Sequence, residues 1–283
     1  MSKLKTATTY EEQIAILQER GIFVSDMDAC RSALRRIGYY RLSAYLLPFR
    51  TQTESYTVSF QRIAQIYHFD TTMHVILSRA ILDIEVFLRS QIAYFHSHKY
   101  GAEGYLDQNI YNSLHNHSRF LDRIASCKKE NENTPIVQHH NQKYGGHFPL
   151  WVIIEFFSMG MLSYFYSDLP TADQKAISRE AYGQVYPLCS WLRCLTDLRN
   201  KCAHYSRMYF WKFSATPKMA RVPFEPNRTL FTQIYMLKLL HPSAETWNAE
   251  VFEKIRLAIA ESRDDVDLAH IGFPENWEDL LSK

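Results

Sequence analysis

The segment from Leu198 to Arg207 gathers the side chains of this chain that are best suited to chemistry. It reads Leu-Arg-Asn-Lys-Cys-Ala-His-Tyr-Ser-Arg, so Arg199 and Asn200 precede His204 by five and four positions. A helix turns by about 100° per residue, and residues three and four positions apart therefore share a face. The polar stripe predicted in this way consists of Arg193, Asp197, Asn200, His204 and Arg207.

These residue types suit the attack of an RNA 2′-hydroxyl on its own adjacent phosphodiester. A histidine can accept or donate a proton near neutral pH. An arginine can neutralise the phosphate oxygens as charge develops on them, and the asparagine can orient the imidazole or a phosphate oxygen. We therefore expect Arg199, Asn200 and His204 to be catalytic, and Arg207 to clamp the RNA backbone. The reaction needs no metal or other cofactor, and the segment has no cluster of acids that would hold a metal ion.

One histidine cannot easily be both the acid and the base of this reaction. Two copies of the helix that meet across a two-fold axis would supply both, which predicts a homodimer or a second motif within the chain. The internal candidate is the pair Arg89 and His96. Glu85 lies one turn before Arg89 as a ready ion-pair partner, so we favour a structural role for this pair.

The same spacing is compatible with a buried network that performs no chemistry. In that alternative, Arg199 pairs with a carboxylate and His204 donates to a backbone carbonyl group. Spacing alone leaves the two interpretations open. Cys202, in the same segment, is expected to be a small core residue rather than a nucleophile.

The composition is that of a globular, mostly helical protein. The chain has 283 residues, of which 46% are hydrophobic and 22% charged. Nine glycines and ten prolines are few for this length, and no segment has the regular strand and turn spacing of a sandwich or barrel. The five cysteines make an odd number without a Cys-x-x-Cys pair, which argues against a disulfide framework and a zinc knuckle. We expect reduced thiols and a cytoplasmic location.

Neither a signal peptide nor a membrane span is expected. The first residues have no apolar stretch behind their lysines. The most membrane-like run, from Phe148 to Tyr166, contains Glu155 and Gly160. A carboxylate near the middle of a spanning helix costs roughly 2.5–3.5 kcal/mol, so a buried core helix, or two helices joined at Ser158 to Gly160, is expected instead.

The net charge is only +2, but basic residues gather in two zones. Between Ala29 and Thr53 there are five arginines and no acid, and between Ala181 and Phe224 seven basic residues accompany one acid. The segment from Glu245 to Lys283 compensates, with ten acids and four bases. Two basic zones, one around His204, indicate a polyanionic partner. The alternative is that the individual arginines only solvate helix faces.

Apolar periodicity predicts a succession of helices. The longest runs from Asp70, as its N-cap, to about His98 and forms the scaffold. The polar stretch from Glu130 to Gly146, which holds His139 and His140, is expected to be a loop without a metal site. The other predicted helices are Tyr10 to Arg20, Met27 to Ile37, Tyr39 to Phe49, about Asn112 to Lys129, Trp151 to Tyr166, Thr171 to Arg179, Tyr186 to about Ser206, Leu230 to Leu240 and Trp247 to Ser262.

The chain also resembles a known family. Arg199 and Asn200 followed by His204 match the Arg-x4-6-His motif of the HEPN superfamily. Nearly the whole chain resembles the Abi-like (AbiD/AbiF) abortive-infection family. The blocks that carry this resemblance, in order, are Gly38 to Tyr45, Phe69-Asp70, Ile84-Glu85 with Leu88-Arg89, Pro149 to Trp151 with Glu155 and Gly160, Leu198 to Arg207, and Gly272 to Pro274 with Trp277.

The resemblance implies an all-α, HEPN-like helical bundle with additional helices at both ends. On this basis the chain divides into an N-terminal helical segment (1–57), a core that carries the motif (58–227) and an acidic C-terminal segment packed on the core (228–283). The family likeness further implies bacterial defence against phage, metal-independent RNA cleavage by Arg199 and His204, and a small structured non-coding RNA as a partner. Because the chain has one clear motif, a composite site requires a dimer.

We expect RNA to bind over Arg41 and the zone from 193 to 221, with the aromatic side chains of Tyr205, Tyr209 and Trp211 available to stack on bases. The residues expected to contact RNA are Tyr40, Arg41, Arg193, Lys201, Tyr205 and Arg207. Two other functions remain open: a module, within a defence or toxin-antitoxin system, that binds RNA without cleaving it, and an interaction protein whose polar stripe is only structural.

Overall fold

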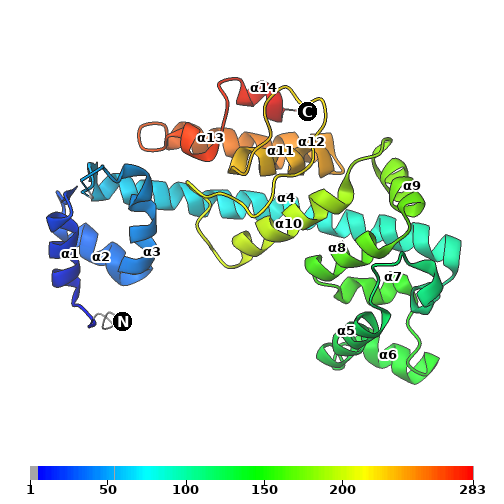
Figure 1. Ribbon diagram of the computed structural model, residues 1–283. Coiled ribbons are helices and arrows are strands. Elements are labelled where there is room, and N and C mark those ends of the chain that lie inside the picture. Colours follow the sequence, from blue (N-terminus) through cyan, green and yellow to red (C-terminus); the bar gives the residue numbers. More distant parts are fainter. Residues whose placement is uncertain (1–5, 54, 283) are drawn as a thin grey trace.

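The computed structural model describes residues 6–53 and 55–282, and helices dominate it (Figure 1). The all-α class expected from the sequence is therefore confirmed. The α-helices are α1 (Tyr10–Glu19), α2 (Met27–Ile37), α3 (Tyr39–Ser43), α4 (Phe60–Tyr100), α5 (His117–Glu130), α6 (Pro135–Tyr144), α7 (Leu150–Ile153), α8 (Met159–Asp168), α9 (Thr171–Tyr182), α10 (Leu188–Ala203), α11 (Leu230–Leu240), α12 (Ala244–Thr246), α13 (Glu253–Glu261) and α14 (Trp277–Leu281).

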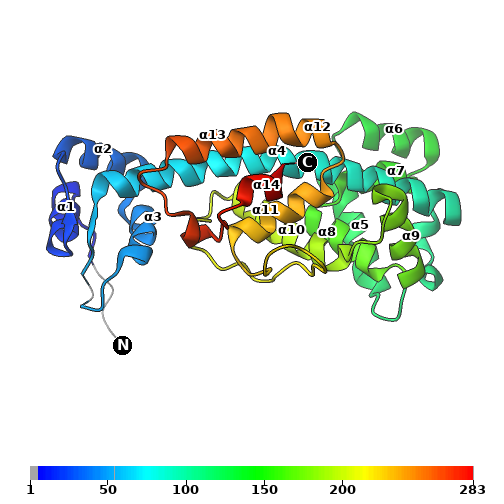
Figure 2. The ribbon, with the colours of Figure 1, turned by 90° about the horizontal axis from the view of Figure 1, so that it is seen from above.

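Helix α4 is the scaffold, and its 41 residues run through most of the long dimension of the molecule (Figures 1 and 2). Helices α1 to α3 lie at one end of it, α5 to α9 gather around the other end, and α10 to α14 lie along its middle. The expectation that Asp70 caps this helix is wrong. Ser59 is the N-cap, with its hydroxyl accepting from the Arg62 backbone N–H at 3.1 Å, and Asp70 is fully buried inside the helix.

Two short strands fasten the N-terminal helices to the start of α4. Strands β1 (Ile22–Phe23) and β2 (Val58–Ser59) pair in parallel, with Ile22 opposite Val58. Both residues are buried. Since β1 follows α1 and β2 leads directly into α4, this pairing sets where the first helices sit against the scaffold.

The stretch from Glu130 to Gly146, expected to be a loop, contains α6. Pro135 stands in its first turn and Gly145 ends it in the left-handed conformation, with φ 61°. These residues are typical of the start and the end of a helix. The many polar residues between them leave little apolar periodicity from which to predict it. Val137 and His140 are the buried residues of α6.

The apolar run around residue 155 forms two helices, as one of the two alternatives predicted. Helix α7 continues into a short 3₁₀ turn, and the Ser158 hydroxyl then caps α8 by accepting from the Met161 N–H at 3.2 Å. Within the described part of the chain, no helix has both the length and the apolar character that crossing a bilayer requires.

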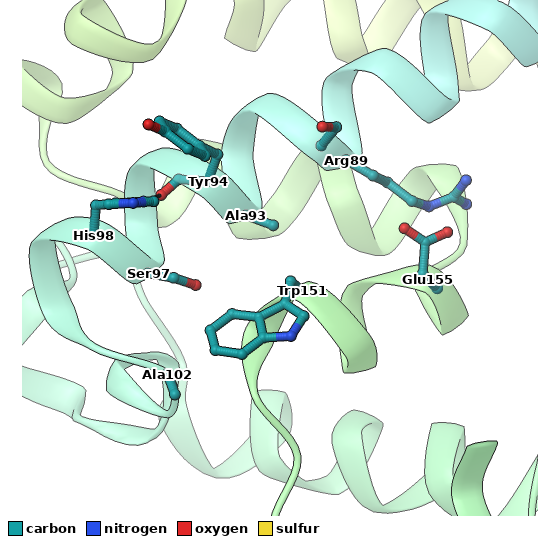
Figure 3. Close-up of a pocket in the computed structure, with 9 residues that line it drawn as sticks. Arg89, Ala93, Tyr94, Ser97, His98, Ala102, Trp151 and Glu155 are labelled. Carbon is teal, nitrogen blue, oxygen red and sulfur yellow. Dashed lines mark hydrogen bonds between the residues drawn. The ribbon is translucent and has the colours of Figure 1, made fainter.

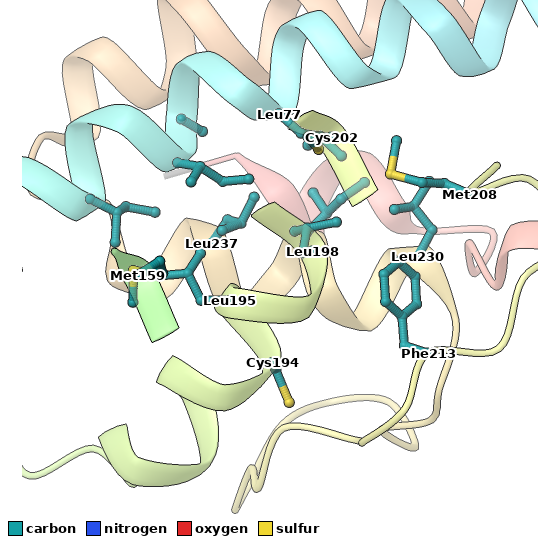
Figure 4. Close-up of a cluster of buried hydrophobic side chains, with 14 of the residues drawn as sticks. Leu77, Met159, Cys194, Leu195, Leu198, Cys202, Met208, Phe213, Leu230 and Leu237 are labelled. Atoms are coloured by element: carbon teal, nitrogen blue, oxygen red, sulfur yellow. The ribbon is translucent and has the colours of Figure 1, made fainter. Parts of the chain in front are cut away.

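Helix α10 packs against α4, α8 and α11 in the middle of the core (Figure 4). Its buried side chains include Leu195, Leu198 and Cys202, which lie among Leu77 of α4 and Leu237 of α11. The apolar face expected for this segment is therefore present. The helix ends at Ala203, however, and not near Ser206, so Arg207 does not lie on the helical stripe of Asn200 and His204.

The C-terminal helices close over the middle of the scaffold. Helix α11 contacts both α4 and α10, and the helical segment from Ala244 to Glu261, which includes a π-helical stretch (Trp247–Phe252), contacts α4. The Trp247 indole is buried and donates to the Leu281 carbonyl at 2.7 Å. This bond ties α14 back to the helices that cover α4.

Candidate functional site

The motif residues lie at the C-terminal end of α10. Arg199 and Asn200 belong to its last turn, and His204 is the C-cap, whose backbone N–H donates to the Asn200 carbonyl at 3.0 Å. With a rise of about 1.5 Å per residue, Arg199 and His204 are separated by about 7.5 Å along the helix axis. Both side chains are thus carried by one short, rigid element whose opposite face is anchored in the core.

These side chains are available to a ligand. Asn200 and His204 are exposed and Arg199 is half-buried. Across residues 6–53 and 55–282, no hydrogen bond or ion pair joins the side chain of Arg199, Asn200 or His204 to another residue. The alternative in which Arg199 pairs with a carboxylate and His204 donates to a carbonyl therefore does not describe this motif.

A buried polar network does exist beside the motif, but Asp70 is its centre. The Asp70 carboxylate accepts from the Tyr45 hydroxyl at 2.6 Å and from the backbone N–H groups of Met208 at 3.0 Å and Tyr209 at 2.9 Å. Burial raises the pKa of this carboxyl, while Tyr45, His74 and the two amides oppose the rise. Asp70 therefore fastens the chain that follows His204 to the scaffold helix.

One turn further along α4, His74 holds the same stretch of chain. It is buried, and its Nε2 lies 2.9 Å from the Ser206 carbonyl oxygen while its Nδ1 lies 2.5 Å from that of Asp70. The Tyr205 ring stacks on the His74 ring, with centroids 5.3 Å apart and planes 7° apart. We call Asp70 and His74, together with the backbone of residues 205–209 that they hold, the α4 clasp.

Arg41 reaches the motif from the N-terminal end of the molecule. Its Nη1 donates to the Tyr205 carbonyl oxygen at 2.6 Å, so the Arg41 side chain spans from α3 to the turn that follows α10. Tyr40, the residue before it, is 90% exposed. Arg41 and the second basic zone thus meet at Tyr205, whereas no hydrogen bond or ring contact joins the Tyr40 side chain to the motif among the described residues.

Cations and exposed rings stand on both sides of His204 in the chain. The Lys201 ammonium lies 3.8 Å from the centroid of a Trp211 ring, and the Arg207 guanidinium carbon lies 5.8 Å from it. Burial lowers the pKa of both Lys201 and Arg207, and Nη1 of Arg207 is buried without a hydrogen-bond partner among the described residues. Partly desolvated cations beside an exposed indole form a surface that suits a nucleic-acid strand.

Only two of the three aromatic residues expected to stack on RNA bases are exposed. Tyr205 and Trp211 are exposed, but Tyr209 is fully buried and its hydroxyl lies 2.8 Å from Nδ1 of His270. Tyr209 is therefore not available to stack on a base, contrary to expectation. Phe210, which sequence reasoning overlooked, is 43% exposed. Arg193 is exposed, but it lies in the first half of α10, away from its C-terminal end.

The pair Arg89 and His96 is structural, as favoured from the sequence. Nη2 of Arg89 donates to Glu85 at 2.6 Å and to the Phe157 carbonyl at 2.8 Å. His96 is fully buried, and burial lowers its pKa to about 4. Arg89 lines a cavity of about 580 Å³ together with Tyr94, Trp151 and Glu155 (Figure 3), but His96 is not among the lining residues.

Cys202 is buried in the core, on the face of α10 opposite the motif side chains. Burial raises the pKa of the Cys202 thiol to about 12, which confirms its expected role as a core residue. Among the described residues, no group of three or more histidine, cysteine, aspartate or glutamate side chains is arranged to hold a metal ion.

Comparison with known proteins places these residues within one family model. The model described as Abi-like protein matches residues 32–210, a range that contains Arg41, the α4 clasp and the whole motif of α10. No match was found to a curated protein or to a solved structure.

Proposed function

The chain belongs to the Abi-like protein family, and on this premise we propose that it is a bacterial anti-phage abortive-infection protein that binds and cleaves RNA at the end of α10. The observation that carries the proposal is the position of the Arg199 and His204 side chains and their lack of partners among the described residues. Both stand on a rigid helix end, among cations and exposed rings, with no partner for their side chains among the described residues.

The proposed reaction transfers the phosphate within the RNA strand. The 2′-oxygen attacks the adjacent phosphorus, and the bond from phosphorus to the 5′-oxygen breaks. One His204 accepts the proton of the 2′-hydroxyl, and a second His204 donates a proton to the leaving 5′-oxygen. Arg199 neutralises the phosphate oxygens in the transition state, and Asn200 orients the imidazole or the phosphate. The products carry a 2′,3′-cyclic phosphate and a 5′-hydroxyl group.

The second His204 comes from a second copy of the chain in this proposal. Helix α4 exposes Val75, Leu82 and Val86 on one face, where they are 62%, 57% and 61% exposed. Arg79, which is ion-paired with Asp83, lies between Val75 and Leu82 on the same face. Apolar residues that gather on one exposed helix face are typical of association surfaces. In this proposal two copies of the chain meet on this face.

RNA would reach the motif over a surface formed by Arg41, Lys201, Arg207 and the rings of Tyr205 and Trp211. Sequencing of the RNA that co-purifies with the protein, together with the chemistry of its ends, tests the proposal. Cyclic phosphate and 5′-hydroxyl ends are expected in the presence of wild type and absent for His204→Ala. An unbroken small structured RNA bound equally by both proteins would contradict cleavage.

The second candidate is a module that holds such an RNA without cutting it. The observation that favours it is that exposed rings and desolvated cations around Trp211 can bind a strand without any proton transfer. It predicts that His204→Ala leaves RNA affinity unchanged and that no cleavage product forms, while Arg207→Ala weakens binding.

A further inference from the structure

Both ring nitrogens of His74 face backbone carbonyl oxygens. Nδ1 lies 2.5 Å from the oxygen of Asp70, and Nε2 lies 2.9 Å from the oxygen of Ser206. A carbonyl oxygen only accepts hydrogen bonds, and a neutral imidazole has a single N–H to donate. The two contacts can therefore both be hydrogen bonds only when the ring is the doubly protonated imidazolium.

The turn that follows His204 is held both by α10 and by residues outside it. The backbone N–H groups of Tyr205 and Ser206 donate to the α10 carbonyls of Cys202 at 3.2 Å and Lys201 at 3.0 Å. Tyr205 has a φ of 49°, a left-handed conformation that bulky side chains adopt at a cost of roughly 1–3 kcal/mol. Its carbonyl oxygen accepts from Arg41, its ring stacks on His74, and the next carbonyl, that of Ser206, faces Nε2 of His74. These contacts compensate the strain and fix the path of the chain.

His204 has no such support of its own. Its side chain makes no hydrogen bond among the described residues, so its direction follows from its backbone, which lies between the last turn of α10 and the turn at Tyr205. A change at Ser206 would therefore change where the imidazole of His204 points.

We propose that His74 is a positioning residue for the RNA site: its protonated ring holds the turn at Tyr205 and Ser206 and thereby sets the orientation of His204. The inference rests on the proposed function for its consequence, but the state of the His74 ring can be measured without RNA. When the ring loses a proton, it can donate to only one of the two carbonyls. The bond to Ser206 then competes with the bond to Asp70, and the turn loosens.

The surroundings of His74 suit this role. The Asp70 carboxyl accepts from the Tyr45 hydroxyl and from two amides, which oppose the rise that burial causes in its pKa. In its ionised form this group sits one turn from the ring and favours the positive charge of the ring. Arg207, whose charge also interacts with Asp70, opposes it. The titratable or charged groups around the clasp are Asp70 on α4, Tyr45 on the segment after α3, Arg41 on α3, Lys201 and Cys202 on α10, and Tyr205 and Arg207 after it.

The first test is nitrogen NMR of the wild-type protein with labelled histidines and no RNA. The His74 signal, assigned by its loss in His74→Gln, should show both ring nitrogens protonated near neutral pH, with slowly exchanging N–H groups. Loss of one proton on raising the pH should be accompanied by faster hydrogen exchange of the amides around Ser206. A ring that carries a single proton across about pH 5–8, the range where histidines titrate, would overturn the proposal.

The second test uses His74→Phe, which keeps the ring stack on Tyr205 but removes both donors. We expect RNA affinity to fall about tenfold at neutral pH, equivalent to about 1.4 kcal/mol, and the pH dependence of affinity seen in wild type to flatten. His96→Phe is the matched control, since it replaces another buried histidine of α4 that has no hydrogen-bond partner among the described residues. It should leave affinity and its pH profile unchanged.

The outcomes separate the two proposals. If wild type binds RNA and His74→Phe keeps the same pH profile and affinity, the positioning role is wrong and the RNA site stands. If wild type binds no RNA while NMR detects the imidazolium with both bonds, the clasp exists and the proposed function is wrong. Should His74→Phe fail to fold, His74→Gln, which keeps one donor, serves as the variant, with the same expected loss of pH dependence.

Discussion

Arg41 donates a hydrogen bond from Nη1 to the backbone carbonyl oxygen of Tyr205, 164 positions later in the chain, at 2.6 Å. This bond joins the N-terminal basic zone to the residue that directly follows His204. Arg41 is exposed, so the same guanidinium that supports the turn is also open to solvent beside the motif. It can support the backbone and offer positive charge to a phosphate at the same time.

Replacement of Arg41 by alanine should weaken RNA binding and flatten its salt dependence. One lost phosphate contact reduces the slope of log affinity against log salt by about 1. Filter binding or fluorescence anisotropy at several salt concentrations measures the slope. Arg179→Ala, an exposed arginine on α9 at the other end of the molecule, should leave both quantities unchanged. Equal effects of the two substitutions would show that Arg41 acts only through overall charge.

Asp70 is expected to be a large contributor to stability. Asp70→Ala leaves the Tyr45 hydroxyl and the amides of Met208 and Tyr209 without their acceptor, and removing one member of such a buried charged network costs roughly 3–5 kcal/mol of the free energy of unfolding. Urea denaturation measures the change. Glu253→Ala, which breaks a solvent-exposed ion pair with Arg256, should have a far smaller effect, because solvent screens such pairs. If Asp70→Ala lowered the free energy of unfolding as little as Glu253→Ala does, the α4 clasp would not stabilise the fold.

The buried His96 side chain should lower the free energy of unfolding in acid. Its folded-state pKa is lowered by burial to about 4, below the ordinary value of 6.5. Between these values the unfolded chain binds a proton that the native chain does not, so the free energy of unfolding falls by roughly 3 kcal/mol as the pH drops from about 6.5 to about 4. His96→Phe should remove this part of the pH dependence in urea titrations. His98→Phe, at an exposed position two residues on, should keep it.

We expect the protein to form a homodimer through the exposed face of α4. Leu82→Lys combined with Val86→Lys should convert a homodimer to monomers in analytical ultracentrifugation, because charges would be buried in the contact between copies. Leu114→Lys changes a residue that is 86% exposed elsewhere on the molecule and should not alter the mass. A wild-type protein that sediments as a monomer at all concentrations would exclude the composite site.

Local signals predicted much of this structure. The apolar spacing of Leu195, Leu198 and Cys202 correctly gave the buried face of α10, and the ion pair between Glu85 and Arg89 followed from their four-residue separation. The error at the end of α10 arose because no glycine or proline marks its stop. The helix ends where Tyr205 turns left-handed. The Ser206 N–H closes this turn on the Lys201 carbonyl, and Arg41 and His74, which are distant in sequence, add contacts to it.

The α4 clasp was missed for a similar reason. Asp70 stands beside polar residues and was interpreted as a cap, although it and His74 occupy positions where the helix otherwise buries apolar side chains such as Leu77. Polar residues four positions apart on the buried face of a long helix were the available signal. Their partners, the amides of Met208 and Tyr209 and the carbonyl of Ser206, become neighbours only in the folded chain.

The most direct test of the central claim is incubation of RNA with wild type, Arg199→Ala and His204→Ala in the presence of EDTA, with Arg179→Ala as the control. Wild type and the control should cut the RNA and leave 2′,3′-cyclic phosphate and 5′-hydroxyl ends. Each motif variant should lose at least about 100-fold in rate, the usual contribution of a single acid, base or charge-stabilising group. Equal cleavage by all four proteins, or none by wild type with any RNA or activating partner, would contradict the proposed nuclease.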